Sequence, residues 1–312
     1  MWGVRWTLSA ETALLDWRVR RLIVNADDFG LTLGVNRAIV EAHQRGIVTS
    51  ATMMAGARAF DDAAEQACSL TSAGTPFGVG CHVVLVDGIP LSPPGQIPSL
   101  LEGADGTARF RDGLGSFATA ALTGRIRPDE LEAEATAQMS RIQQAGVTPS
   151  HFDTHKHAHM FPAILRPLLR AAKACGIPAV RNPFGPGDSL SLARIATDIK
   201  LGKRSVQMNV LRSFAPGFRR EVARHGLRTT DGSVGVQVTG ILDLDVFIEI
   251  ANNLPDGTWE FVCHPGYSDG DLDQVKTRLR ESRRQELEVL TSPEAKNALE
   301  RRGVQLISYH EL

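Results

Sequence analysis

Short apolar segments alternate along the chain with longer segments in which apolar residues recur every three or four positions. The first pattern is typical of buried parallel strands, and the second of amphipathic helices that cover a sheet. Strands are therefore predicted at 21–26, 47–54, 77–86, 147–154, 177–181, 259–263 and 304–308. Helices are predicted between them, at 32–44, 58–70, 128–146, 162–175 and 242–252. This alternation predicts the α/β class, with a parallel sheet whose strands are joined by helices.

Two stretches and the N-terminus interrupt this pattern. Residues 87–115 are rich in Gly and Pro, and we expect a loop over the mouth of the fold. Residues 184–240 mix short helical pieces with Gly and Pro. They form either an insertion that shapes the substrate cleft or contacts a partner, or a plain surface insertion. Residues 1–20 are read as an extension before a single catalytic domain at 21–312. The extension carries three tryptophans, Trp2, Trp6 and Trp17. They could insert into a membrane interface, but a loosely packed extension or a misjudged start site is the preferred interpretation.

Composition narrows the classes of protein. With 312 residues, 43% of them apolar, the chain can form one domain with a large core. The 34 Lys and Arg residues balance 35 Asp and Glu residues, which argues against a nucleic-acid-binding protein. The four cysteines form no CxxC pair, and no apolar stretch reaches the ~18 residues of a transmembrane helix. We therefore expect a cytoplasmic protein; a homodimer and a peripheral contact with the inner membrane stay open.

The densest group of reactive side chains lies in the segment HFDTHKHAH. It places His151, Asp153, His155, His157 and His159 at alternate positions, which would project to one face of an extended strand. Burial of so many imidazoles is costly unless they bind a metal or one another. The segment therefore predicts a metal site rather than a solvated turn. Only some of these residues can be ligands, because a catalytic zinc usually has three protein ligands and an open position.

Further candidates lie in other predicted strands or directly after them. Asp27 and Asp28 are adjacent at a strand end, where neighbouring side chains diverge, so one carboxylate could bind a metal and the other a water. His82 could be a ligand or an ordinary buried histidine, and His264, before a Pro-Gly turn, a proton donor or a structural residue. Arg181 could pair with a carboxylate or be solvated. Because parallel strands end at one mouth, these groups can meet there.

Four motifs carry a resemblance to a known family. They are NADDFG, the GxxxH stretch that ends at His82, HxDxHxHxH followed by MFP, and HPGY. In this order and spacing the chain resembles the YdjC-like carbohydrate deacetylases, which include chitooligosaccharide deacetylases, from about Leu22 to the C-terminus. The resemblance implies a distorted (β/α) barrel like that of polysaccharide deacetylases.

The resemblance also implies roles for single residues. Asp28, His82 and His155 would bind the metal, Asp27 would be the general base and His264 the general acid. Substrate binding or support of the ligands is implied for the other members of these motifs and, more loosely, for one arginine: His151, Asp153, His157, His159 and Arg181.

The implied reaction is hydrolysis of the N-acetyl group of an amino sugar. A divalent cation, Zn²⁺ or else Mg²⁺, would polarise the amide carbonyl and acidify the attacking water. The middle segment and the closing strand before YHEL are more similar to hopanoid-biosynthesis-associated members, which implies an N-acetylglucosaminyl hopanoid lipid as substrate. A chitooligosaccharide is the alternative. Two other classes stay open: a metal-dependent phosphohydrolase, although only Lys156 stands in the histidine cluster to bind phosphate, and a non-catalytic metal-binding protein with a closed coordination shell.

Overall fold

The computed structural model describes residues 19–312 except 75, 103–108, 188–189, 192–193 and 196–198. Within these residues a parallel sheet of seven strands has the order β6-β3-β2-β1-β8-β7, with β9 paired to β1. Its strands are β1 (Arg20–Phe29), β2 (Ser50–Met53), β3 (Gly78–Val83), β6 (Phe152–Thr154), β7 (Gly232–Val234), β8 (Gly257–Cys263) and β9 (Val304–Leu306). The α/β class predicted from the hydrophobic pattern is confirmed.

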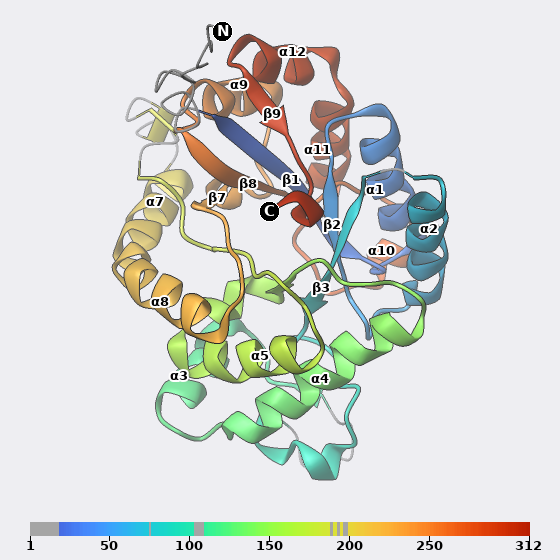
Figure 1. Ribbon diagram of the computed structural model, residues 1–312, viewed down its shortest axis with the longest axis vertical. Coiled ribbons are helices and arrows are strands. Elements are labelled where there is room, and N and C mark those ends of the chain that lie inside the picture. Colours follow the sequence, from blue (N-terminus) through green and yellow to red (C-terminus); the bar gives the residue numbers. More distant parts are fainter. Residues whose placement is uncertain (1–18, 75, 103–108, 188–189, 192–193, 196–198) are drawn as a thin grey trace, which may run out of the picture.

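The sheet curls into a distorted barrel, with helices around its outside (Figure 1). Beyond β6 the curl continues through two isolated bridges, Phe152 to Val180 and Ala179 to Arg228, instead of a regular ladder. The regular strand predicted at 177–181 is therefore wrong. Pro178 has no amide hydrogen to donate to a neighbouring strand, which keeps the pairing short. The expected distorted (β/α) barrel is confirmed, with this irregular side.

Helices cover the sheet from outside (Figure 1). The first begins after Thr32, whose side chain accepts a hydrogen bond from the backbone amide of Val35 at 3.2 Å, as an N-cap does. In chain order the helices are α1 (Leu33–Arg45), α2 (Phe60–Ser72), α3 (Leu114–Leu122), α4 (Pro128–Gln144), α5 (Pro162–Ala174), α7 (Ile199–Leu211), α8 (Ala215–His225), α9 (Leu244–Asn252), α10 (Gly270–Asp273), α11 (Glu281–Thr291) and α12 (Pro293–Arg301).

The stretches that interrupt the pattern have short elements of their own. The stretch 87–115 contains the hairpin of β4 (Leu101–Glu102) and β5 (Arg109–Phe110), so it is more than a loop. The insertion at 184–240 contains α7, the 3₁₀ helix η5 (Arg212–Phe214), α8, β7 and the 3₁₀ helix η6 (Val236–Val238), in agreement with the predicted short helical pieces. The tryptophans at 2, 6 and 17 lie outside the described residues.

The core explains why polar groups gather at the strand ends. In β1 every residue from Leu22 to Phe29 is buried, because helices cover one face of the curled sheet and side chains of the barrel interior fill the other. The carboxyl end of this strand nevertheless carries Asp27 and Asp28, which are 2% and 4% exposed. Buried carboxylates of this kind need partners, and the barrel supplies them. None of the described helices is long and apolar enough to cross a membrane.

Candidate active site

The ends of four strands supply the five residues expected to carry the chemistry. Asp27 and Asp28 lie in β1, His82 in β3, His155 directly after β6 and His264 directly after β8. All five line one cavity of about 440 Å³. The structure therefore brings together the residues that the motifs single out, at the carboxyl ends of the parallel strands.

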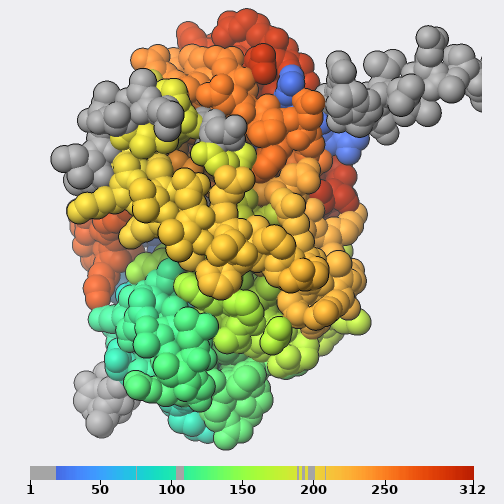
Figure 2. Space-filling view, turned by 90° about the vertical axis from the view of Figure 1, so that its left-hand side faces the viewer, coloured from blue at the N-terminus to red at the C-terminus, as the bar shows by residue number. Residues whose placement is uncertain are grey.

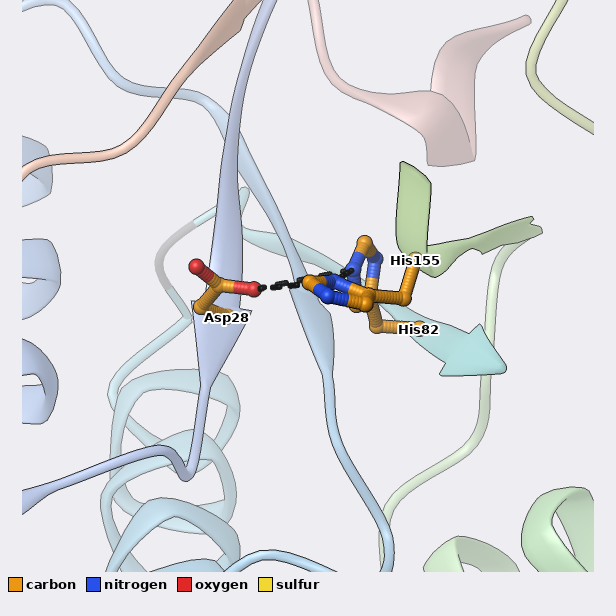
Figure 3. A group of neighbouring side chains, drawn as sticks. All are labelled: Asp28, His82 and His155. Carbon is orange, nitrogen blue, oxygen red and sulfur yellow. Dashed lines mark hydrogen bonds and ion pairs between the residues drawn. The ribbon is translucent and has the colours of Figure 1, made fainter. Parts of the chain in front are cut away.

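Three of them form a candidate metal centre, shown in Figure 3. Asp28 Oδ1 lies 3.6 Å from His82 Nε2 and 3.9 Å from His155 Nδ1, and the two imidazole nitrogens are 3.4 Å apart. Ligand atoms of a tetrahedral zinc, each ~2.0–2.2 Å from the ion, lie roughly 3.3–3.6 Å from one another. The two imidazoles and one carboxylate thus fit a divalent cation in both chemistry and spacing.

Asp153 orients His82 in this centre. Its Oδ1 lies 2.8 Å from His82 Nδ1, so the Nε2 atom faces Asp28 and His155. A carboxylate behind a histidine is the usual support for a metal-binding imidazole. Burial alone would lower the pKa of His82, but the carboxylates of Asp153, Asp27 and Asp28 together raise it to about 9.

A second group of possible ligands consists of Asp27, His82 and Asp153. This group is a poorer metal site, because the guanidinium of Arg181 contacts both of its carboxylates and would repel a cation. The group that contains Asp28 is therefore the better candidate.

The carboxylate of Asp28 is shared between this centre and an arginine. Asp28 has a left-handed backbone (φ 69°) at the strand end, and Arg283 Nη2 donates a hydrogen bond to its Oδ2 at 2.5 Å. Burial favours a higher pKa for this carboxyl group, but Arg283 and the nearby histidines lower the pKa below its usual range. Arg283 is itself buried, and its Nη1 has no hydrogen-bond partner although the residue lines the cavity.

Arg181 lies at the centre of a buried network of charges. Its guanidinium donates to both carboxylate oxygens of Asp27, at 2.9 and 2.6 Å, to Glu260 at 2.8 Å and to Asp153. The Tyr309 hydroxyl donates to the other oxygen of Glu260 at 2.6 Å. Burial would raise the pKa of Asp27, but Arg181 lowers it well below its usual range. Of the two roles that the sequence left open for Arg181, pairing is confirmed.

His264 borders the cavity between two carboxylates. Its Nε2 is 3.7 Å from Asp27 Oδ2, and its Nδ1 is 3.9 Å from Glu286, which also accepts a hydrogen bond from the His264 backbone amide at 2.6 Å. Two residues later, a Cβ on Gly266 would lie 2.9 Å from Cδ of Arg283. The glycine of the HPGY motif therefore makes room for the arginine that holds Asp28.

The prediction that HFDTHKHAH is one extended strand is wrong. Strand β6 ends at Thr154, and His155–Met160 forms the 3₁₀ segment η4, in which Lys156 and His157 have left-handed backbones (φ 57° and 54°). The turn rotates successive side chains away from one another, so the alternate residues do not share one face. Only His155 of the four histidines joins the candidate metal centre.

The other three histidines of the segment have separate environments. His151 lies between Ser150 and Asn25, at 3.0 and 3.1 Å, and stacks on Tyr309. His159 Nε2 lies 3.1 Å from the carbonyl oxygen of Arg181, so it supports the backbone of the charge network. His157 lines the cavity, and its buried Nδ1 has no hydrogen-bond partner. Of the three, His157 is therefore the one that lines the cavity.

Several functional neighbours were not predicted from the sequence. Arg283 lies on α11 and Glu286 one turn later, while Glu260 is in β8 and Tyr309 begins the closing turn. In the sequence, Arg283 and Glu286 look like the ordinary surface charges of an amphipathic helix. Of these four residues, only Glu260 could have been recognised from the sequence, because a carboxylate inside the apolar strand WEFVC requires a buried partner.

Fold and site together define a class: α/β-barrel proteins with a carboxylate-histidine centre at the carboxyl ends of the strands. The chain belongs to the family of YdjC-like proteins, whose family model matches residues 21–301. The family that the four motifs implied is confirmed.

Similar proteins agree with this assignment. The chain is 33% identical over 293 residues to a carbohydrate deacetylase of Brevibacillus brevis, covering 94% of this chain and 99% of that one. It is 36% identical to a carbohydrate deacetylase of Geobacillus stearothermophilus, covering 94% of this chain and 98% of the relative. The crystal structure of a candidate cellobiose-phosphate cleavage protein from Enterococcus faecalis has a TM-score of 0.73 and 26% identity, covering 94% of this chain and 98% of the other.

Proposed function

We propose that this chain is a metal-dependent carbohydrate deacetylase, which hydrolyses the N-acetyl group of an amino sugar to a free amine and acetate. The observation that carries the proposal is the grouping of Asp28, His82 and His155, whose ligand atoms all lie within 4.8 Å of one another. The same cavity contains a carboxylate and a histidine that are not needed as ligands, Asp27 and His264. The carbohydrate deacetylases that are 33% and 36% identical support this chemistry.

Asp28, His82 and His155 would hold the cation. Zn²⁺ is the preferred candidate over Mg²⁺, because imidazole ligands suit zinc whereas magnesium prefers oxygen ligands. When bound, such a cation supplies Lewis-acid chemistry, which polarises a carbonyl oxygen and makes water more acidic.

Asp27 is the proposed general base. Arg181 keeps it ionised, and Asn25 donates a further hydrogen bond to its Oδ1 at 3.0 Å, so the carboxylate is held in a defined orientation at the cavity wall. In this position it would accept the proton of the attacking water.

His264 is the proposed general acid. It borders the same cavity as Asp27, and an imidazolium there would protonate the departing nitrogen. This proton is required because an amide anion is a poor leaving group. A residue of β1 would thus accept one proton, and a residue directly after β8 would donate another.

The walls of the cavity support a substrate with an apolar part. Seven side chains of the lining are aliphatic or thioether: Leu31, Met54, Val84, Val86, Val236, Val275 and Leu279. Such a wall favours an apolar aglycone beside the sugar, because burial of apolar surface stabilises binding. We propose an N-acetylglucosaminyl hopanoid lipid as the substrate, with a chitooligosaccharide as the alternative.

Acetate release tests the proposal directly. Purified protein loaded with zinc is incubated separately with N-acetylglucosaminyl hopanoid and with diacetylchitobiose, and acetate is measured. Acetate from the hopanoid supports both the reaction and the substrate, whereas acetate from diacetylchitobiose alone contradicts the lipid substrate only. A third incubation contains a sugar phosphate. Release of phosphate there, without acetate from the other two compounds, would show a phosphohydrolase instead of a deacetylase.

A cytoplasmic location is proposed as well. All four cysteines are unpaired, and Cys81 and Cys263 are buried. Free thiols suit a reducing compartment.

A further inference from the structure

The outer side of α7 carries a row of exposed apolar side chains. Val206 and Val210 are 64% and 65% exposed, and Phe214, in the following η5, is 42% exposed. A spacing of four residues places successive side chains on one side of a helix. The other large apolar side chains that are exposed among the described residues, Leu33, Ile89 and Leu122, come from three separate parts of the chain.

The surrounding segment is strongly basic. Residues 199–225, which include α7, η5 and α8, contain seven lysines and arginines against the single carboxylate of Glu221, a formal charge of +6. The whole chain has a formal charge of −1, so this segment differs from the rest of the molecule. Lys203 and Arg212 are exposed, and in the chain they stand three residues before Val206 and two residues before Phe214. Figure 2 shows the segment, in yellow and light orange, on the face toward the viewer.

Exposed apolar side chains in a strongly basic segment are the chemistry of a helix that lies at a lipid surface. The apolar side chains enter the boundary between headgroups and acyl chains, and Lys and Arg contact lipid phosphates. A protein partner is disfavoured, since a stable protein interface buries ~800 Å² on each side and a row of three side chains is narrow for it. We propose that the α7 face (Lys203, Val206, Val210, Arg212 and Phe214) docks this protein on an anionic phospholipid membrane.

Hydrogen bonds connect helix α7 to a wall of the candidate active site. Arg204 of α7 donates hydrogen bonds to the carbonyl oxygens of Gln237 and Thr239, at 2.9 and 3.1 Å. Val236 and Thr239, in and directly after η6, line the catalytic cavity. The helix that contacts the membrane is thus bonded to a wall of the cavity, an arrangement suited to a substrate that is drawn from a lipid surface.

Vesicle flotation tests this docking. The full chain is mixed with vesicles of equal phosphatidylglycerol and phosphatidylcholine, or of phosphatidylcholine alone. The protein should float with the anionic vesicles only, and less at high salt, because salt screens exposed charges. Combined Val206→Ser, Val210→Ser and Phe214→Ser substitutions should weaken partitioning by on the order of tenfold or more, as should Lys203→Glu with Arg212→Glu.

Two control variants test whether the effect depends on the α7 face, since they remove an exposed apolar side chain or reverse a charge elsewhere on the surface. Leu122→Ser removes an equally exposed apolar side chain from α3, and Lys296→Glu reverses an exposed charge on α12. Both should float like the unmodified protein, and a circular-dichroism melt checks that each variant folds. Unchanged flotation of the α7 variants, or no flotation of the unmodified protein, overturns the proposal. Self-association without lipid that the serine variant abolishes also overturns it, in favour of a second copy of the chain.

Flotation is measured without substrate. Failure of the docking proposal therefore leaves the deacetylase proposal intact, and failure of acetate release leaves the docking result intact.

Discussion

Asp27 and Asp28 are neighbours in the sequence, yet their carboxylates have different partners. Asp27 is held by Arg181, whereas Asp28 faces His82 and His155 with one oxygen and Arg283 with the other. The cause is the strand end, where the left-handed backbone of Asp28 turns its side chain away from that of Asp27. One carboxylate is therefore free of the candidate metal centre and can act in proton transfer.

Substitution of each aspartate should separate the two roles. Asp27→Asn removes the proposed base and should lower turnover by ~10²- to 10⁴-fold with bound zinc retained. Asp28→Asn removes a ligand and should lower the zinc content. Acetate release and elemental analysis measure the two effects, and loss of zinc from Asp27→Asn alone would show that the two residues have exchanged roles.

His264 should be required for turnover but not for metal binding. His264→Ala removes the proposed proton donor and should lower turnover by ~10²- to 10⁴-fold, because the amine leaving group is no longer protonated. Zinc content should stay that of the unmodified protein, since the imidazole is not part of the candidate metal centre. His225→Ala, a histidine on α8 outside the cavity, is the control and should leave turnover unchanged. A normal rate for His264→Ala would exclude the residue as the general acid.

At the scale of elements, the pairing of β3 with β6 positions the ligand His82 of the candidate metal centre. Cys81 pairs with Phe152 and His82 with Asp153, so the ligand on β3 lies beside the residue that orients it. Gly80 of β3 leaves room for the side chain of His151, which lies directly before β6. A Cβ at Gly80 would lie 2.5 Å from the ring of His151, and His151 is fully buried.

Gly80→Ala should therefore destabilise the protein. The added methyl group forces the His151 ring or the strand to move, which should lower the free energy of unfolding by ~1–3 kcal/mol in a urea titration. Gly115→Ala is the matched control, because a Cβ at Gly115 in α3 meets nothing within 4 Å. The control should raise the free energy of unfolding by ~0.5–1 kcal/mol, as Ala does in a helix. Equal stability of Gly80→Ala and the unmodified protein would show that the contact can relax freely.

At the scale of the whole molecule, ion pairs connect the side of the barrel that regular strand pairing does not close. Arg181 follows the irregular bridges at 179–180 and contacts carboxylates from β1, β6 and β8. A bound cation would join β1, β3 and the turn after β6 in a similar way, through Asp28, His82 and His155. Stability of the molecule should therefore depend on the metal.

Zinc should raise the melting temperature of the unmodified protein, and a chelator should reverse the increase. A ligand that binds only the folded state at 100 times its Kd stabilises it by about 2.7 kcal/mol. His155→Ala removes one ligand and should show a much smaller increase, whereas His225→Ala should retain the full increase. Differential scanning calorimetry measures the shift, and an undiminished shift in His155→Ala would exclude His155 as a ligand.

The sequence by itself determined the alternation of strands and helices and the positions of Asp27, Asp28 and His264 at strand ends. These features are local, since hydrophobic periodicity depends on residues a few positions apart. The same local information could not decide the shape of HFDTHKHAH. Alternate spacing suits a strand, but the left-handed backbones of Lys156 and His157 turn the chain after Thr154.

Only the tertiary structure decided which charges meet. Arg283 is 255 positions from Asp28, and Arg181 is 154 positions from Asp27, so no local pattern links either pair. These contacts depend on how α11 packs and on how the barrel closes, because buried charges are stable only beside the partners that the fold brings to them. The sequence shows which residues can bind a metal. Their orientation by Arg181, Arg283 and Glu260 is a property of the folded barrel.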